Sequence, residues 1–195
     1  LTPIRDERGR LLYSNAILRD ITELKQIQRA LQQEKETSER LLLNILPECI
    51  SGRLKQNATI ISDGIASSTI LFSDIVGFTT MSEQMSPGQL IILLNTIFTE
   101  FDNLVETHEL EKIKTIGDAY MIASGVPVAR DDHAAAIAEL ALEMKNIMTE
   151  LNRDSGIPLD IRIGVNSGPV IAGVIGKKKF AYDLWGDTVN TAARM

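Results

Sequence analysis

Apolar residues recur at two different spacings after position 60, and these spacings predict strands and helices in alternation. Short apolar runs bounded by turn residues predict strands at 68–73, 112–116, 119–123, 159–166 and 170–175. Gly117-Asp118 is expected to turn the chain between the second and third strands, and Ser167-Gly168-Pro169 between the last two. Helical spacing predicts a helix from Ser86-Pro87, a second over about 132–151 and a third from near Asp187. This order of elements indicates an α+β or an α/β fold, of which we expect α+β.

The N-terminal part of the chain follows another pattern. A polar turn at 6–10 and an apolar stretch at 11–18 predict a hairpin-like turn and a strand. From Asp20 to about Leu46 a helical pattern runs without Gly or Pro, and Pro47 is expected to end or kink the helix. Two rows of its residues recur at heptad spacing. One row is Leu24, Leu31, Ser38 and Ile45, and the other is Gln28, Lys35 and Leu42. The rows favour a short parallel coiled coil, although their polar members weaken it, and a solvated helix is the alternative.

Composition excludes several classes of protein. A chain of 195 residues with 44% hydrophobic residues can bury one substantial core, and a net charge of −6 argues against nucleic-acid binding. The single cysteine, Cys49, rules out an internal disulfide and suits a reducing cytosol. With only His108 and His133, a multi-histidine metal centre or a Ser-His-Asp hydrolase is disfavoured. No apolar run reaches the ~18–20 residues that cross a bilayer. We therefore expect a cytoplasmic segment without membrane contact, although the full-length protein could be membrane-tethered.

Two aspartates carry the candidate chemistry. Asp74 and Asp118 each follow an apolar strand-like stretch and lie beside a glycine-containing turn. Two carboxylates at the same end of neighbouring strands form a site for hard divalent cations such as Mg²⁺, which prefer oxygen ligands. Small turns beside them leave backbone N–H groups free to receive phosphates. The alternative is that each aspartate merely begins a turn, as aspartates often do.

Four segments that include these aspartates resemble the class III nucleotide cyclase catalytic domain. They are FSDIVGFT at 72–79, KTIGDAYM at 114–121, RIGVNSGPVIAGVIG at 162–176 and YDLWGDTVNTAARM at 182–195. The resemblance covers roughly residues 60–195, with the segments in the family's order. It implies a ferredoxin-like fold, in which a mixed sheet is flanked by helices.

The resemblance also implies roles for particular residues. Asp74 and Asp118, with the carbonyl of Ile75, would hold two Mg²⁺ or Mn²⁺ ions over a triphosphate. The turn from Val76 through Gly77, Phe78 and Thr79 would place backbone N–H groups against the phosphates. Asn190 would orient the ribose, and Arg194 would stabilise charge on the reacting phosphate. The two lie four residues apart and are expected to share a helix face.

Lys114 and Asp183 lie at the positions from which the family reads the base. A lysine donor and an aspartate acceptor complement adenine, whereas guanylate cyclases usually carry Glu and Cys there. The resemblance therefore implies an adenylate cyclase that converts ATP to 3′,5′-cyclic AMP and pyrophosphate. A guanylate cyclase and an inactive dimerisation or nucleotide-sensing module are the alternatives. A polymerase-like nucleotidyl transferase would share the two aspartates, but the acidic net charge disfavours it.

By the same resemblance the active enzyme is a homodimer. Each site would take its metal aspartates from one protomer, and Lys114, Asp183, Asn190 and Arg194 from the other. Small changes in how two coiled-coil helices cross would then open or close both sites, so that an upstream sensor of the same chain could set the rate.

These observations divide the chain into four expected parts. Residues 1–20 resemble the end of a PAS-type sensor domain, 21–47 form a coiled-coil signalling helix, 48–62 a connector and 63–195 the catalytic domain. The catalytic domain is expected to be C-terminally incomplete, because the family's triphosphate-binding lysine and last strands lie beyond Met195. Pro169 stands where some family members have a basic residue, and Lys177-Lys178-Lys179 could partly compensate.

Overall fold

The structure, a computed structural model, describes residues 2–15, 20–43, 45–56, 61–155, 158–176 and 180–195. Its contacts divide the chain into two compact units, Leu1–Asn44 and Ile45–Met195. In the first unit, strands β1 (Thr2–Arg5) and β2 (Leu11–Asn15) pair antiparallel. The turn between them is closed by Asp6, whose carboxylate accepts hydrogen bonds from the N–H groups of Arg8 and Arg10. The predicted hairpin is thus confirmed, and the remainder of the predicted strand, 16–18, lies outside the described residues.

Helix α1 (Thr22–Leu43) is the other element of the first unit. Its first turn is capped by Asp20, whose carboxylate accepts the N–H of Thr22 at 2.8 Å, as expected for a helix that starts here. None of its side chains is buried, and the heptad leucines Leu24 and Leu31 are 64% and 66% exposed. The helix is confirmed with slightly shorter bounds, and the coiled coil stays a prediction.

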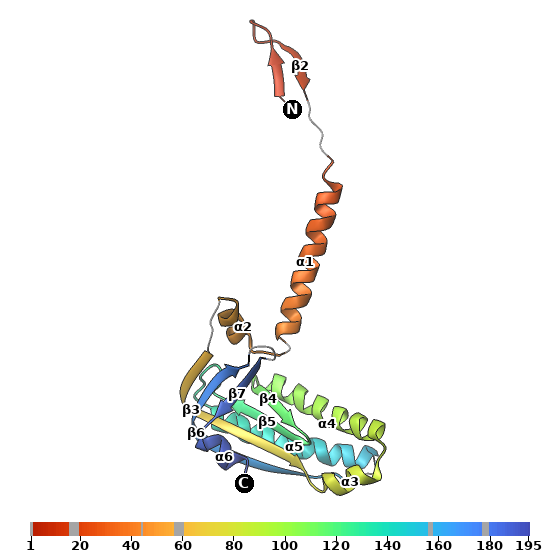
Figure 1. Cartoon of the computed structure of the whole chain (residues 1–195), viewed down its shortest axis with the longest axis vertical. Helices are drawn as coiled ribbons and strands as arrows, with labels where there is room; N and C mark the ends of the chain where they lie inside the picture. The colour runs from red at the N-terminus through yellow and green to blue at the C-terminus, as the bar shows by residue number, and fades with distance from the viewer. Residues whose placement is uncertain (1, 16–19, 44, 57–60, 156–157, 177–179) are drawn as a thin grey trace. The chain divides into compact units, whose positions relative to one another are not determined.

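Among its described residues the second unit contains ten elements, which Figure 1 labels. They are α2 (Glu48–Lys55), β3 (Ile61–Ile75), α3 (Phe78–Gln84), α4 (Pro87–Thr107), β4 (Glu111–Ile116), β5 (Ala119–Ser124), α5 (His133–Ser155), β6 (Ile161–Ile175), β7 (Ala181–Trp185) and α6 (Asp187–Ala192). The strands form one five-stranded sheet in the order β4-β5-β3-β6-β7. The expected α+β fold is confirmed.

Every pairing in this sheet is antiparallel across the described residues, where the sequence predicted a mixed sheet. The reason is the strand order. The crossover through α3 and α4 does bring β4 back parallel to β3, but β5 lies between them and pairs antiparallel with both. No two neighbouring strands are therefore parallel.

Strand β6 also corrects the predicted turn at Ser167-Gly168-Pro169. The chain continues through this segment as one strand of 15 residues, and Thr69 of β3 pairs with Ser167. Pro169 lies where the β3–β6 register shifts, between the pairs Ile65↔Val170 and Ser68↔Gly168. A proline has no N–H to donate to a ladder, so it is tolerated at such an irregularity. Pairing with a long neighbouring strand here overrides the local turn signal.

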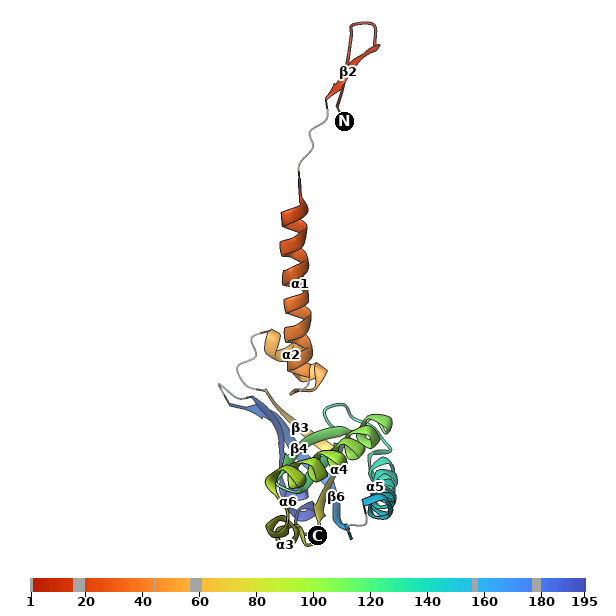
Figure 2. The same ribbon diagram turned by 90° about the vertical axis from the view of Figure 1, so that its right-hand side faces the viewer.

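Helices α4 and α5 pack on one face of the sheet, as Figures 1 and 2 show. Their inner faces and alternate strand residues form the core around Leu71, Phe101 and Tyr120. Helix α4 begins as predicted at Ser86-Pro87, with a capping box in which Ser86 and Gln89 satisfy each other's backbone N–H groups. The two helices cover one face of the sheet.

Helix α6 packs on the opposite face of β6. Ile161, Ile163 and Val165 face the core, while Gly164 between them faces α6. A Cβ atom on Gly164 would lie only 2.2 Å from the carbonyl oxygen of Ala192. Thr188 fixes the start of the helix, because its hydroxyl donates to the carbonyl of Pro169 at 2.7 Å.

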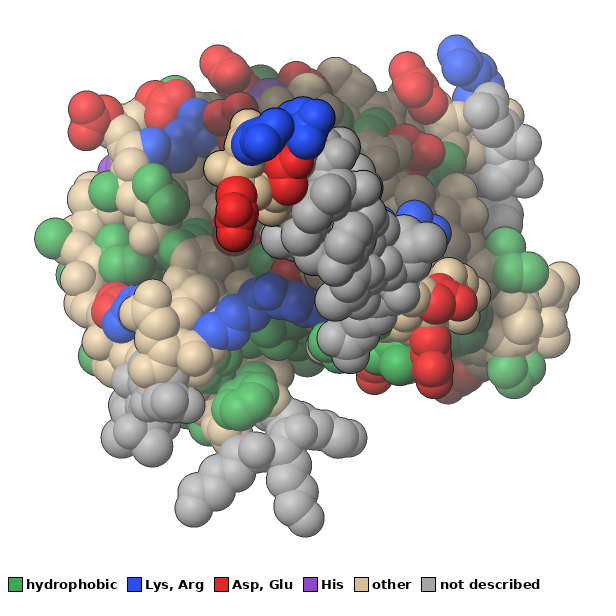
Figure 3. Space-filling model, turned by 90° about the horizontal axis from the view of Figure 1, so that it is seen from above, with side chains coloured by type: hydrophobic (Ala, Val, Ile, Leu, Met, Phe, Trp, Pro, Cys, Tyr) green, Lys and Arg blue, Asp and Glu red, His purple; other side chains and the backbone are tan. Residues whose placement is uncertain are grey.

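None of the helices in the described residues combines the length and the apolar character that crossing a bilayer requires. In the view of Figure 3 both acidic and basic side chains are visible.

Candidate active site

Asp74 and Asp118 meet at one end of the sheet. Asp74 is the penultimate residue of β3, and Asp118 lies in the two-residue turn between β4 and β5. Because β5 pairs with β3 through Ser73↔Tyr120, this turn is brought beside the end of β3. Gly117 makes the turn possible with φ of 64°, a conformation that side-chain-bearing residues rarely adopt. The predicted juxtaposition of two carboxylates at the ends of neighbouring strands is present in the structure.

The pKa of Asp118 reports how closely the carboxylates approach. Burial raises this pKa above its ordinary value, and the nearby Asp74 carboxyl raises it further through a hydrogen bond and through its charge. The backbone N–H groups of Asp118 and Ile75 act in the opposite direction. Two carboxylates in contact repel each other when both are ionised, and a bound cation relieves that repulsion.

The donor set at this end fits a hard cation. Within the described residues no group of three or more His, Cys, Asp or Glu side chains converges. A cation here would therefore take two carboxylates and complete its shell with backbone oxygen, water or substrate oxygen, as Mg²⁺ commonly does. The side chain of Ile75 is buried in the core and only 2% exposed, so this residue could contribute only through its backbone.

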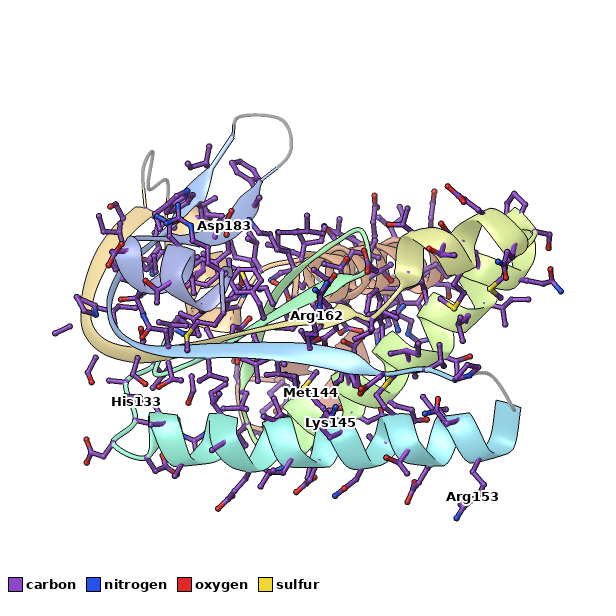
Figure 4. The ribbon with its side chains drawn as sticks, turned by 90° about the horizontal axis from the view of Figure 1, so that it is seen from below. His133, Met144, Lys145, Arg153, Arg162 and Asp183 are labelled. Carbon is purple, nitrogen blue, oxygen red and sulfur yellow. The ribbon has the colours of Figure 1, made fainter. Side chains whose placement is uncertain are left out.

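Arg162 is a site residue that the sequence reasoning missed. It lies directly across from Asp74 in the β3–β6 pairing, and its guanidinium forms an ion pair with the Asp74 carboxylate. Figure 4 shows it on the side of β6 that faces away from α5. A charged residue between two apolar ones, Ile161 and Ile163, is a signal that could have drawn attention to it.

A cavity of about 400 Å³ opens beside this pair. Asp74, Arg162 and Phe72 line it from the strands, and Arg194 and Met195 from the segment after α6. Asp74 and Arg194 thus face the same cavity within one chain. Neither Lys114 nor Asp183 lines it.

Lys114 and Asp183 contact each other elsewhere on the sheet. They belong to β4 and β7, the two edge strands, which nevertheless approach each other. The Lys114 ammonium donates to the Asp183 carboxylate at 2.5 Å, and both side chains are partly buried. The donor and acceptor that the sequence assigned to one base pocket are therefore neighbours in space.

Asn190 and Arg194 are placed by α6. Asn190 is exposed within the helix, whereas Arg194 follows the helix end in a turn, with its N–H bonded to the carbonyl of Thr191 at 3.0 Å. The helix ends at Ala192, so Arg194 lies in the turn that follows it, and the shared face stays a prediction. Arg194 faces the cavity through its own turn.

The candidate phosphate turn joins β3 to α3. Gly77 adopts φ of 72° at the start of α3, which directs the chain away from the sheet. Phe78 packs partly against the core, and Thr79 is exposed. The N–H of Val76 donates to the carbonyl of Asp160 at 2.9 Å, so it is not free for a phosphate.

Comparison with known proteins identifies the family. The model of the adenylate and guanylate cyclase catalytic domain matches residues 61–195, and the chain belongs to this family. A Mycobacterium tuberculosis adenylate cyclase is 45% identical over 179 residues, 91% of this chain. Human guanylyl cyclase C is 43% identical over 187 residues, 94% of this chain. The chain spans 40% of the first relative's length and 17% of the second's.

Solved structures of cyclases share the fold. The adenylyl cyclase CyaB from P. aeruginosa matches with a TM-score of 0.65 at 31% identity, over 68% of this chain and 71% of its own. The guanylate cyclase domain of RhGC from Catenaria anguillulae, in complex with GTP, matches with a TM-score of 0.66 at 39% identity, over 68% and 73%. A bacterial light-regulated adenylyl cyclase matches over 92% of this chain and 52% of its own, with a TM-score of 0.71 at 26% identity. The class III cyclase fold is thus confirmed.

Proposed function

We propose that this chain carries the catalytic domain of an adenylate cyclase, which forms 3′,5′-cyclic AMP and pyrophosphate from ATP. The observation that carries the choice of ATP is the contact between Lys114 and Asp183. The pair offers one donor and one acceptor side by side, and adenine presents the complementary acceptor at N1 and donor at N6. The relationship to the mycobacterial adenylate cyclase supports the same choice.

Asp74, Asp118 and the backbone of Ile75 would hold two Mg²⁺ or Mn²⁺ ions. Ions held there would lower the pKa of the ribose 3′-hydroxyl and shield the charge of the triphosphate. The protein's part is to hold the two carboxylates together on the ends of paired strands. The turn at Gly77, Phe78 and Thr79 lies next to Asp74 along the chain, where its backbone would receive phosphate oxygens.

Arg194 would stabilise negative charge on the reacting phosphate. A guanidinium remains charged and presents several donors in a fixed fork, which suits this purpose. Its position on the cavity that Asp74 also lines supports the assignment. Asn190 would orient the ribose from the exposed face of α6.

Base recognition requires Lys114 and Asp183 to give up their contact with each other and to bond to the base. Without nucleotide they satisfy each other, and with adenine each would bond to the base edge instead. An incorrect base would leave buried polar groups unpaired, at a cost of roughly 1–3 kcal/mol for each group. The pair would therefore select ATP mainly by rejecting GTP.

A homodimer would complete each site. Lys114 and Asp183 do not line the cavity beside Asp74, but neither do Asp118 and Asn190, so the site shared between two protomers rests on the resemblance to class III cyclases. The exposed heptad leucines of α1 would pair the chains upstream, and a sensor N-terminal to them would act through this helix. A bacterial light-regulated adenylyl cyclase matches over 92% of this chain, which supports regulation by a sensor.

A two-residue exchange tests base selection in the protein that carries this domain. We expect Lys114→Glu with Asp183→Cys to lower the rate of cyclic AMP formation and to raise that of cyclic GMP, because the donor and acceptor positions are exchanged. The control is Lys145→Glu with Asp160→Cys, which alters an exposed ion pair of similar length, 2.6 Å, between α5 and the residue that precedes β6. Purified variants are assayed with ATP and GTP in the presence of Mn²⁺, and kcat/KM is compared. An unchanged preference in the Lys114 and Asp183 variant contradicts the assignment.

Guanylate cyclase is the second candidate, because human guanylyl cyclase C and retinal guanylyl cyclase 2 are 43% and 44% identical to this chain. An assay of the unmodified protein with ATP and with GTP distinguishes an adenylate cyclase from a guanylate cyclase. Preference for GTP favours this candidate, and no turnover of either nucleotide favours an inactive nucleotide-sensing module.

A further inference from the structure

We propose that Asp102 of α4 is a positioning residue for base recognition. It holds Lys112 on the α4 side of the sheet and so fixes a β-bulge that turns Lys114 to the other side, toward Asp183. The inference rests on the proposed base-reading role of Lys114 and Asp183. It concerns two residues, Asp102 and Lys112, to which the proposed reaction gives no role.

The bulge lies between the two lysines of β4. Residues two apart on a regular strand point to the same face of the sheet. Here Lys112 pairs with Ile122 of β5. The next pair of the ladder is Lys114 with Met121, so the residue between the two lysines is an extra one on β4. One extra residue in a strand is a β-bulge, and it exchanges the faces of the residues that follow.

The two lysines accordingly have partners on different sides of the sheet. Ile122 belongs to the core that α4 and α5 cover, and its cross-strand partner Lys112 lies on that side. The Lys112 ammonium donates to both carboxylate oxygens of Asp102, at 2.5 and 2.8 Å. Lys114 contacts Asp183 of β7 instead. A regular strand that kept Lys112 on Asp102 would direct Lys114 toward α4 as well, where it could not meet Asp183.

Asp102 is itself held in place by Tyr120 of β5. The Tyr120 side chain is fully buried, and its hydroxyl donates to the same carboxylate. Burial raises the pKa of this hydroxyl above its ordinary value, and the bond to Asp102 and its charge raise the pKa further, so the hydroxyl keeps its proton. The Lys112 ammonium also lies 5.0 Å from the centroid of the Tyr120 ring, whose face attracts a cation. One carboxylate of α4 thus ties together both strands of the hairpin.

The position of β4 in the sheet explains why it needs this contact. The strand lies at the edge of the described sheet, with β5 as its neighbour in the strand order. A one-residue change of register there would move its side chains to the other face. Helix α4 lies beside β4 (Figure 1), and the contact between Asp102 and Lys112 gives the strand a second fixed point.

Nucleotide preference tests the proposal in the protein that carries this domain. We expect Asp102→Asn and Lys112→Met each to lower the ratio of kcat/KM for ATP to kcat/KM for GTP roughly three- to tenfold, because Lys114 loses its fixed direction. A merely destabilised fold lowers both rates together and leaves this ratio unchanged. Purified variants are assayed with each nucleotide in the presence of Mn²⁺. If Asp102→Asn does not fold, Lys112→Met carries the test alone, because that side chain is 37% exposed.

Two comparisons show whether the effect passes through Lys114. In a Lys114→Met background, Lys112→Met should change the ratio no further, and a further change would overturn the positioning role. The matched control is Asp160→Asn, which removes the carboxylate from another lysine ion pair, with Lys145 at 2.6 Å. This control should keep the ratio of the unmodified protein.

Lys114→Met separates this inference from the proposed function. If Lys114→Met keeps the preference of the unmodified protein, base reading is misassigned and both proposals fail. If Lys114→Met loses the preference while Asp102→Asn and Lys112→Met keep it, base reading stands and the positioning role is overturned.

Discussion

At the scale of single residues, Glu111 makes the stability of the fold depend on pH. Burial raises the pKa of this half-buried carboxyl from its ordinary value of 4.5 to about 7. Between these values the folded protein keeps a proton that the unfolded chain has released. The resulting stabilisation is complete below the lower value and is lost as the pH rises through about 7.

We therefore expect Glu111→Gln to remove this dependence. The midpoint of thermal unfolding should fall between about pH 5 and about pH 8 in the unmodified protein, and it should fall less in the variant. Glu83→Gln, at an exposed acid, is the control. Circular dichroism melts across this pH range provide the measurement, and parallel curves for the unmodified protein and Glu111→Gln would contradict the assignment.

The sequence identified most of the candidate site at this scale. Asp74 and Asp118 stand beside strand ends, so their proximity follows from the order of the strands. Lys114 and Asp183 lie within β4 and β7, and they were found through their positions in recognisable segments. Arg162 was missed because an arginine on a strand usually faces solvent. Its contact with Asp74 depends on the register between β3 and β6, which the pattern of a single strand does not determine.

At the scale of elements, the close packing of α6 on β6 limits which residues are tolerated at position 164. A Cβ atom at Gly164 would lie 2.2 Å from the carbonyl oxygen of Ala192, which is backbone and cannot rotate away. We expect Gly164→Ala to destabilise the fold by about 1–3 kcal/mol, because α6 must shift. It should also lower kcat, because Arg194 follows that helix.

Gly52→Ala is the matched control for this prediction. Gly52 lies within α2, where an added Cβ atom meets nothing within 4 Å. Alanine there should stabilise by about 0.5–1 kcal/mol, since glycine is a poor helix former. Urea denaturation of both variants gives the free energies of unfolding. Equal stabilities for Gly164→Ala and the unmodified protein would show that α6 does not depend on this contact.

Local patterns identified the helices better than the ends of the strands. The capping signal at Ser86-Pro87 placed the start of α4 because capping is a property of adjacent residues. The Ser-Gly-Pro segment at 167–169 has strong turn chemistry, yet it lies inside β6. Its conformation is decided by pairing with Ser68 and Thr69, about a hundred residues earlier in the chain, which local propensity cannot anticipate.

At the scale of the whole molecule, the question is which residues act within one protomer. Asp74 and Arg194 line one cavity of a single chain, whereas Lys114 and Asp183 do not line it. The resemblance to class III cyclases assigned Arg194 to the partner protomer together with the base-reading pair. In one arrangement Arg194 acts with the Asp74 of its own chain, and in the other it acts with the Asp74 of the partner protomer. The two arrangements predict different recovery of activity when inactive variants are mixed.

Mixing experiments distinguish the arrangements. Asp74→Asn and Asp183→Ala, each inactive alone, should regain about a quarter of the unmodified activity when mixed, because half of the dimers are mixed and each has one intact site. Mixing Asp74→Asn with Arg194→Ala then locates the arginine. Equal rescue means that Arg194 acts across the dimer interface, whereas no rescue means that it acts on the aspartates of its own chain, as the shared cavity indicates. No rescue in either mixture would contradict the homodimer, because a site built within one protomer gains nothing from a partner.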